Sequence, residues 1–159
     1  MKKYLIIALS ITFLYSCNKS NDTTEGGHHH ETKTPLNEQT EAMLAIHDSI
    51  MPHMDKLMDL KKQLKNDVKI TDSLLALKST NALKIRKEEA LKITSQLDST
   101  DKAMMNWMHE FKFDTLEKLD KTEAASYVAD QKMKIESVRE QMNKSLSDAN
   151  QFIEKTKKK

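Results

Sequence analysis

Glycine is missing from nearly the whole of this chain. Gly26 and Gly27 are the only two glycines, and the sequence from residue 28 to residue 159 contains only two prolines. Tight turns with positive φ usually need glycine, so a chain without it makes few such turns. The same region is rich in Leu, Lys, Glu, Ala, Met and Gln, which favour helix. We therefore predict an all-α fold built from a few long helices.

Capping residues indicate where these helices begin and end. Thr34-Pro35 fits an N-cap followed by proline at the first helical position. Asn66-Asp67 would begin a turn, and Thr71 or Asp72 would cap the next helix. The run Asp114-Thr115-Leu116-Glu117 resembles a capping box. Within residues 34–159 the predicted helices span about 35–65, 71–109 and 114–155, and the polar run 98–101 could interrupt the second.

The third predicted helix has a regular seam with the 3-4 spacing of a coiled coil. Two of its members, Gln131 and Ser145, are polar. Short connections place neighbouring helices antiparallel, so we expect an elongated, coiled-coil-like, up-down-up three-helix bundle. The seam could close inside one chain or between copies, which leaves a homo-oligomer open. The seam residues are Val128, Gln131, Ile135, Val138, Met142, Ser145, Ala149 and Phe152.

The N-terminus has a pattern of a different kind. A short basic segment precedes the apolar stretch Tyr4–Leu14, which fits a secretory signal and is too short for the ~20 residues of a membrane-spanning helix. Cys17 is the only cysteine. The run Leu14-Tyr15-Ser16-Cys17 resembles the lipobox of bacterial lipoproteins, with Tyr15 bulkier than the usual small residue. The resemblance implies that residues 1–16 are a removed signal peptide and that Cys17 carries a covalent lipid.

Residues 17–33 would then form a tether behind the lipid. After the cysteine this segment has no aliphatic side chain, so it cannot bury enough apolar surface to order itself and would act as a flexible linker. Its run His28–His30 could bind a transition metal weakly, although we interpret it as a polar piece of linker.

The net charge indicates that the lipid, rather than basic side chains, is the contact with the membrane. The whole chain has a net charge of +2, and removal of residues 1–16 takes away Lys2 and Lys3 but no acidic residue. The mature chain is therefore neutral, and no basic face for nucleic acid is indicated. We expect a protein secreted across the inner membrane and lipid-anchored in the cell envelope, in the outer membrane, on either its periplasmic or its outer face.

Methionine and histidine gather on one strip of the first predicted helix. Their spacings of four, four, three and four residues keep them on one face. Thioether and imidazole groups are the ligands that soft Cu(I) prefers. Methionine also fills gaps in helix–helix cores, and methionine-rich surfaces bind partner segments. The strip consists of Met43, His47, Met51, Met54 and Met58.

A second Met/His group ends the second predicted helix, beside Trp107 and Phe111. With the first turn near residue 68, an antiparallel register places Met43 level with about residue 94, so the two groups would not join into one site. Pro52 inside the first helix should kink it. Asp48 is not expected to orient His47, because adjacent helix positions do not face each other. The second group consists of Met104, Met105, Met108 and His109.

Three segments together resemble a family of small helical lipoproteins of Bacteroidota, some of which carry the label "viral A-type inclusion protein". The segments are His47-Asp48-Ser49-Ile50-Met51-Pro52-His53-Met54, Leu60-Lys61-Lys62-Gln63-Leu64 and Met104-Met105-Asn106-Trp107-Met108-His109-Glu110-Phe111. The resemblance implies a helical, secreted, lipid-anchored protein. The family has no assigned activity or catalytic residues, so none is carried over.

These patterns support three hypotheses for the function. The first is a structural or interaction module, which includes a chaperone-like role, that engages an envelope protein partner. The second is binding of Cu(I) or another transition metal by the Met/His face. The third is a peptidoglycan-associated spacer, because the basic run Lys155–Lys159 is similar to the end of the major peptidoglycan-linked lipoprotein of enteric bacteria. Basic residues also complement a helix dipole at this end. No Ser-His-Asp or paired-carboxylate site can be argued, so we do not expect an enzyme.

Overall fold

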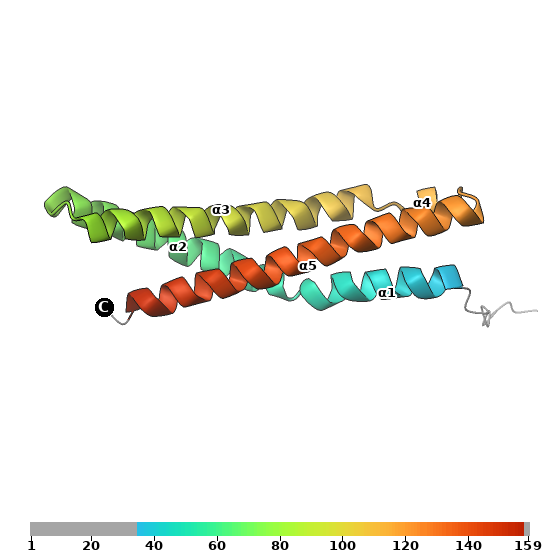
Figure 1. Cartoon of the computed structure of the whole chain (residues 1–159), viewed down its shortest axis with the longest axis horizontal. Coiled ribbons are helices and arrows are strands. Elements are labelled where there is room, and N and C mark those ends of the chain that lie inside the picture. The colour runs from blue at the N-terminus through green and yellow to red at the C-terminus, as the bar shows by residue number, and fades with distance from the viewer. Residues whose placement is uncertain (1–34, 158–159) are drawn as a thin grey trace, which may run out of the picture. The chain divides into compact units, whose positions relative to one another are not determined.

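A computed structural model describes residues 35–157, and the only regular secondary structure in this part of the chain is helix (Figure 1). The predicted signal peptide 1–16, the lipidated Cys17 and the tether 17–33 lie outside the described residues. The prediction of an all-α fold is confirmed. The helices are α1 (Pro35–Ile50), α2 (His53–Leu77), α3 (Asn81–Glu110), the single-turn α4 (Phe113–Leu116) and α5 (Lys121–Lys157).

Four of these helices pack together, where three were expected. Helices α2 and α3 pack on each other and on α5, and α1 packs on α5 ahead of α2 (Figure 1). The first expected helix is divided in two by Pro52, which has no N–H to donate to the preceding turn. The backbone N–H of Met51 still donates to the carbonyl of His47 at 3.0 Å, and the N–H of Met54 donates to Met51 at 3.0 Å. The predicted kink at Pro52 is therefore a break between α1 and α2.

The first turn lies further along the chain than predicted. Asn66 and Asp67 are inside α2, and the chain turns at Lys78, Ser79 and Thr80. Thr80 is the N-cap of α3, and its hydroxyl accepts a hydrogen bond from the N–H of Leu83 at 3.3 Å. Lys78 and Thr80 both have extended backbone with negative φ. This turn therefore needs no glycine, as the composition requires.

The cap predicted at Thr71 or Asp72 is wrong for the same reason. Thr71 lies in the interior of α2 and is fully buried. Asp72 forms an ion pair with Lys87 of α3, with 2.6 Å between Oδ1 and Nζ. These two polar residues suit an N-cap, but they lie within α2, where one is buried and the other pairs with α3.

Helix α3 continues without a break through residues 98–101, contrary to the alternative left open by the sequence. The hydroxyl of Ser99 donates to the carbonyl of Ser95 at 2.9 Å, and that of Thr100 donates to Gln96 at 3.0 Å. These bonds to the preceding turn let hydroxyl residues stay within a helix.

The third long helix begins later than expected. Asp114–Glu117 belongs to the short α4 and its end, and the helix α5 starts at Lys121. The carboxylate of Asp120 accepts from the N–H groups of Thr122 at 2.8 Å and Glu123 at 2.9 Å. The carboxylate of Glu123 accepts from the N–H of Asp120 at 3.4 Å. The functioning capping box is therefore the second Asp-x-x-Glu of this region, residues 120–123.

The predicted seam of α5 is confirmed, since all eight of its residues are buried. It supplies one side of two core clusters, one with α2 and α3 and one with α1 and α3. No helix among residues 35–157 combines the length and apolar character needed to cross a membrane.

Candidate functional site

The second core cluster lies where α1, α3 and α5 meet, next to the break at Pro52. Met43 and Ile50 come from α1, Met104 and Trp107 from α3, and Ile135 and Val138 from α5. Met54, Met108 and Phe111 pack against it and are partly buried. Residues of both predicted Met/His groups therefore meet in one place.

This meeting overturns the expected register. When the turn of an antiparallel pair of helices moves by one residue along the chain, the residue that faces a given position in the first helix moves by two. The displacement of the turn from about residue 67 to residues 78–80 therefore moves α1 opposite the C-terminal half of α3. His47 then faces Trp107, with ring centroids 5.2 Å apart in a stacked arrangement.

Within the described residues, a hydrogen bond holds only one edge of the His47 ring. Its Nδ1 lies 2.9 Å from Oδ1 of Asp48, although neighbouring helix positions were not expected to meet. The Asp48 carboxylate is largely exposed. At the other edge of the ring, Nε2 is buried and has no hydrogen-bond partner among the described residues.

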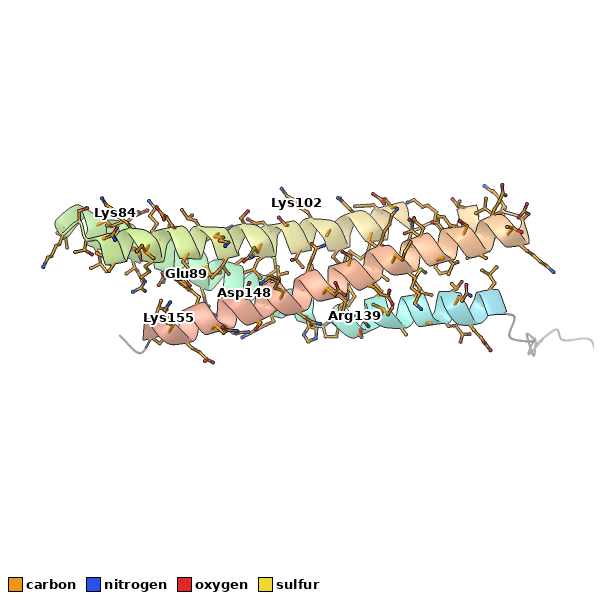
Figure 2. The ribbon with its side chains drawn as sticks, in the orientation of Figure 1. Lys84, Glu89, Lys102, Arg139, Asp148 and Lys155 are labelled. Carbon is orange, nitrogen blue, oxygen red and sulfur yellow. The ribbon has the colours of Figure 1, made fainter. Side chains whose placement is uncertain are left out.

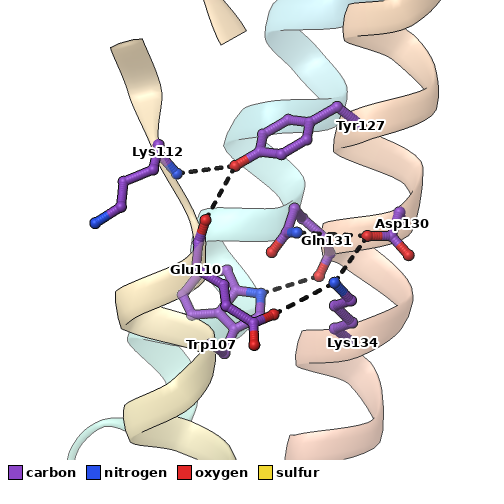
Figure 3. Close-up of polar contacts among 7 residues, drawn as sticks. All are labelled: Trp107, Glu110, Lys112, Tyr127, Asp130, Gln131 and Lys134. Carbon is purple, nitrogen blue, oxygen red and sulfur yellow. Dashed lines mark hydrogen bonds and ion pairs between the residues drawn. The ribbon is translucent and has the colours of Figure 1, made fainter. Parts of the chain in front are cut away.

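Trp107 is fixed from α5. Its indole N–H donates to the backbone carbonyl of Gln131 at 3.0 Å (Figure 3). On its far side it stacks on Phe111, with ring centroids 5.6 Å apart, and Phe111 in turn contacts Phe113 and Tyr127. A ladder of rings thus runs from His47 to the end of α3.

The end of α3 is closed by Tyr127. Its hydroxyl accepts from the N–H of Lys112 at 2.8 Å and donates to the carbonyl of Glu110 at 3.4 Å (Figure 3). Nearby, Lys134 pairs with Asp130 at 3.0 Å and with the Glu110 carboxylate at 3.4 Å. Hydrogen bonding to Asp130 outweighs desolvation and raises the pKa of Lys134.

The predicted ligands are distributed unequally around this site. Met43 and Met104 are fully buried, and Met54, Met108 and His47 are partly buried. Met51, Met58, Met105 and His109 are exposed. The sequence missed Asp48 as the partner of His47, and it missed the contact of His47 with Trp107. The adjacency of Asp48 to His47 in the sequence was the available signal for the first contact. The contact between His47 and Trp107 could have been found only with the corrected register.

A second candidate surface is the hairpin tip, which we define as residues 69–87 around the α2–α3 turn. Figure 1 shows this turn beyond the last turn of α5. At its base, Lys155 of α5 pairs with Glu89 of α3 at 3.7 Å, and Lys84 lies towards the tip (Figure 2). Four large apolar side chains of the tip are exposed: Ile70, Leu74, Leu77 and Ile85.

No protein-family model matches the chain, and no curated protein or solved structure matches it. Within residues 35–157, no three His, Cys, Asp or Glu side chains form a group that could hold a metal ion. This statement concerns imidazole, thiolate and carboxylate ligands, and it does not extend to the thioether groups of methionine.

Proposed function

We propose that the chain is a lipid-anchored protein of the bacterial cell envelope and that its helical unit is an interaction module. The lipobox-like run ending at Cys17 and the neutral charge of the mature sequence support the anchor. In this proposal α1 and α2 form one broken rod, and with α3 and α5 they make an up-down-up bundle of three rods. The protein acts by binding and spacing rather than by catalysis.

The exposed apolar residues of the hairpin tip carry this proposal. Leu77 is 86% exposed, next to the exposed Lys78 at the turn. Contiguous exposed apolar surface on a soluble unit commonly marks an interaction site. The last turn of α5 reaches Ile70 and Ile85 at the base of the tip, and the α2–α3 turn next to Leu77 extends beyond it (Figure 1).

The charge of the tip favours one class of partner. Residues 69–87 contain five basic residues and one acidic residue. Arg86 pairs with Asp67 and Lys87 pairs with Asp72, so the basic character of the tip comes from Lys69, Lys78 and Lys84. Complementary charge steers association and disfavours wrong partners. The occupant we propose is therefore an amphipathic envelope protein segment with an apolar face bordered by acidic side chains.

The position of α1 adds a mechanical element. Helix α1 begins at the end of the helical unit opposite the tip (Figure 1). A lipid anchor attached ahead of α1 would hold that end near the membrane and present the tip to partners away from it. The reach of the tether and the length of the bundle would together limit the distance from the membrane at which contact is made.

The anchor is tested by intact-mass measurement of the mature protein from membrane fractions. We expect a chain that begins at Cys17 and carries acyl chains, and we expect Cys17→Ala to abolish both the acyl mass and the membrane association. A mature protein with a free Cys17 thiol, or one that retains residues 1–16, would reject the anchor.

The contact surface is tested separately by photo-crosslinking in the cells that produce the protein. A photoreactive residue at Leu77 should capture one envelope protein, whereas the same residue at Met133, also apolar and 64% exposed, should not. Replacing Lys78 and Lys84 by Glu should weaken capture. Many unrelated clients at Leu77 would indicate the chaperone-like version, and no adduct, or equal adducts at both positions, would reject the tip as the contact surface.

A further inference from the structure

We propose that His47 is the central ligand of a soft transition-metal site, with Cu(I) as the ion, and that the thioethers of Met43 and Met51 complete it. This inference is independent of the interaction proposed for the hairpin tip. It selects three residues of the Met/His strip and excludes the others.

The hydrogen bonding of His47 defines the role of each ring nitrogen. An ionised carboxylate can only accept, so the Asp48 contact at 2.9 Å requires the proton on Nδ1. In the neutral ring, Nε2 then presents a lone pair. Nε2 is buried without a partner among the described residues, although buried polar atoms are normally paired. An imidazole oriented by a carboxylate, with its other nitrogen free, is the usual arrangement of a metal-binding histidine.

The two thioethers lie one helical turn on either side of His47. Met43 precedes it by four residues, and Met51 follows it by four, so each Cα is about 6 Å away along the helix axis. The N–H of Met51 still donates to the His47 carbonyl at 3.0 Å, so the helical register extends to Met51 despite the break. Met43 is fully buried and Met51 is 36% exposed, which places one sulfur donor in the core and one at the surface.

The composition of the site determines the ion. One imidazole and two thioethers form a soft ligand set, which favours Cu(I) over Mg²⁺, Ca²⁺ or Mn²⁺. The other two members of the strip lie beyond the Pro52 break. Met54 follows His47 by seven residues and packs against both core clusters. Met58 is 52% exposed. His53, which is not part of the strip, begins α2 and is exposed.

Trp107 provides a local readout. It is the only tryptophan of the chain, and its ring is stacked on His47 with centroids 5.2 Å apart. An ion bound to His47 must therefore change the indole fluorescence, and replacement of the run His28–His30 by serine must leave this change intact. Fluorescence and affinity together separate the two sites.

The test is a titration of the chain from residue 17 onward with Cu(I) against a competing chelator under reducing conditions. The core residues of the described part lie between Met43 and Phe152, so this chain contains the described helical unit. Cys17→Ser is included throughout, because a free thiolate would bind Cu(I) on its own. We expect one Cu(I) per chain, with a change in Trp107 emission that saturates at the same ratio.

Matched variants make the result decisive. His47→Leu should abolish the fluorescence change and competitive binding. Met51→Leu and Asp48→Ala alter exposed side chains, and loss of a supporting ligand or ligand partner should weaken binding by about tenfold or more. Met58→Leu and His53→Ala should leave affinity unchanged. Circular dichroism checks that each variant stays folded.

Three outcomes would overturn the site. They are no binding stronger than the chelator, binding that survives His47→Leu, or binding that disappears when His28–His30 are replaced by serine. If His47→Leu fails to fold, the exposed Met51→Leu and Asp48→Ala variants still decide the question, because unchanged affinity in both contradicts the assignment.

Discussion

Lys61 is the only charged side chain that is buried in the described part of the bundle, and two carboxylates of α3 surround its ammonium group. Its Nζ lies 2.7 Å from Asp98 and 2.9 Å from Asp101. Burial alone would lower the pKa of Lys61, but the hydrogen bonds to the two carboxylates outweigh burial and raise it. The charged pair therefore stabilises the contact between α2 and α3.

This pKa shift predicts a loss of stability at alkaline pH. Because the pKa is raised in the folded state, the contribution is complete below the unfolded lysine value of about 10.4 and is lost as pH rises through the higher folded value. Against Lys61→Met, the wild type should gain about 1 kcal/mol from the ion pairs at neutral pH. Chemical denaturation of both proteins from pH 8 upward measures this. A difference in unfolding free energy that does not change with pH would contradict the assignment.

Gln131 presents the opposite case, a buried side chain with an unpaired atom. Its Oε1 is buried and has no partner among the described residues, while its backbone carbonyl accepts from Trp107 at 3.0 Å. Gln131→Met keeps the backbone bond and removes the unpaired oxygen, so we expect unfolding free energy to rise by about 1 kcal/mol. Gln141→Met on the exposed face of α5 is the control and should have little effect. Equal thermal unfolding temperatures for Gln131→Met and the wild type would show that Oε1 carries no penalty.

For single residues, the sequence predicted which side of a helix is buried but not which side chains contact each other. The α5 seam followed from the 3-4 spacing, because period alone decides which face is buried. The strip from Met43 to Met58 was also visible, but the unequal burial of its members was not, since Pro52 separates them in space. The bond from His47 to Asp48 depends on side-chain rotamers, which residue spacing does not determine.

The helical elements show how capping signals compete. Two Asp-x-x-Glu runs lie six residues apart, and only residues 120–123 form the reciprocal bonds of a capping box. Asp114 lies in the short α4 instead. The first run was the predicted start of the helix, and that prediction is wrong because a local motif does not specify which of two equivalent starts is compatible with the packing of the long helix.

Paired substitutions test this assignment. Asp120→Ala removes an acceptor from two N–H groups at the start of α5, so it should lower unfolding free energy by about 1 kcal/mol. Asp114→Ala should have an effect below about half of that value. Urea denaturation of the two variants and the wild type measures both changes in unfolding free energy. Equal costs, or a larger cost for Asp114→Ala, would mean that α5 starts at the earlier run.

The turn at residues 78–80 was missed for a related reason. Asn66-Asp67 is a familiar turn signal, but Asp67 accepts hydrogen bonds from both Nε and Nη2 of Arg86 and stays within α2. A contact between helices overrode a local preference. Ser79-Thr80 was the available signal for the true turn, where Lys78 and Thr80 both have extended backbone with negative φ.

Across the whole described unit, stability should decline towards the hairpin tip. The last turn of α5 lies beside the base of the tip, at Ile70 and residues 82–86, and the α2–α3 turn extends beyond it (Figure 1). Segments with few buried apolar contacts open locally at low cost. Hydrogen exchange followed by mass spectrometry should show that residues 70–84 exchange faster than the buried half of α3, and a bound partner should slow them. Uniform protection in the free protein would imply that the tip is already covered.

The position of the first turn decides the arrangement of the whole unit, because it brings His47 of α1 onto Trp107 of α3. Nuclear Overhauser effects between the imidazole protons of His47 and the indole protons of Trp107 test this most directly. The stacking at 5.2 Å predicts strong cross-peaks between the two rings. If the chain turned at residues 66–67, His47 would face the first half of α3. The absence of His47–Trp107 cross-peaks in the folded protein, with cross-peaks to that first half in their place, would contradict the register and the metal site built on it.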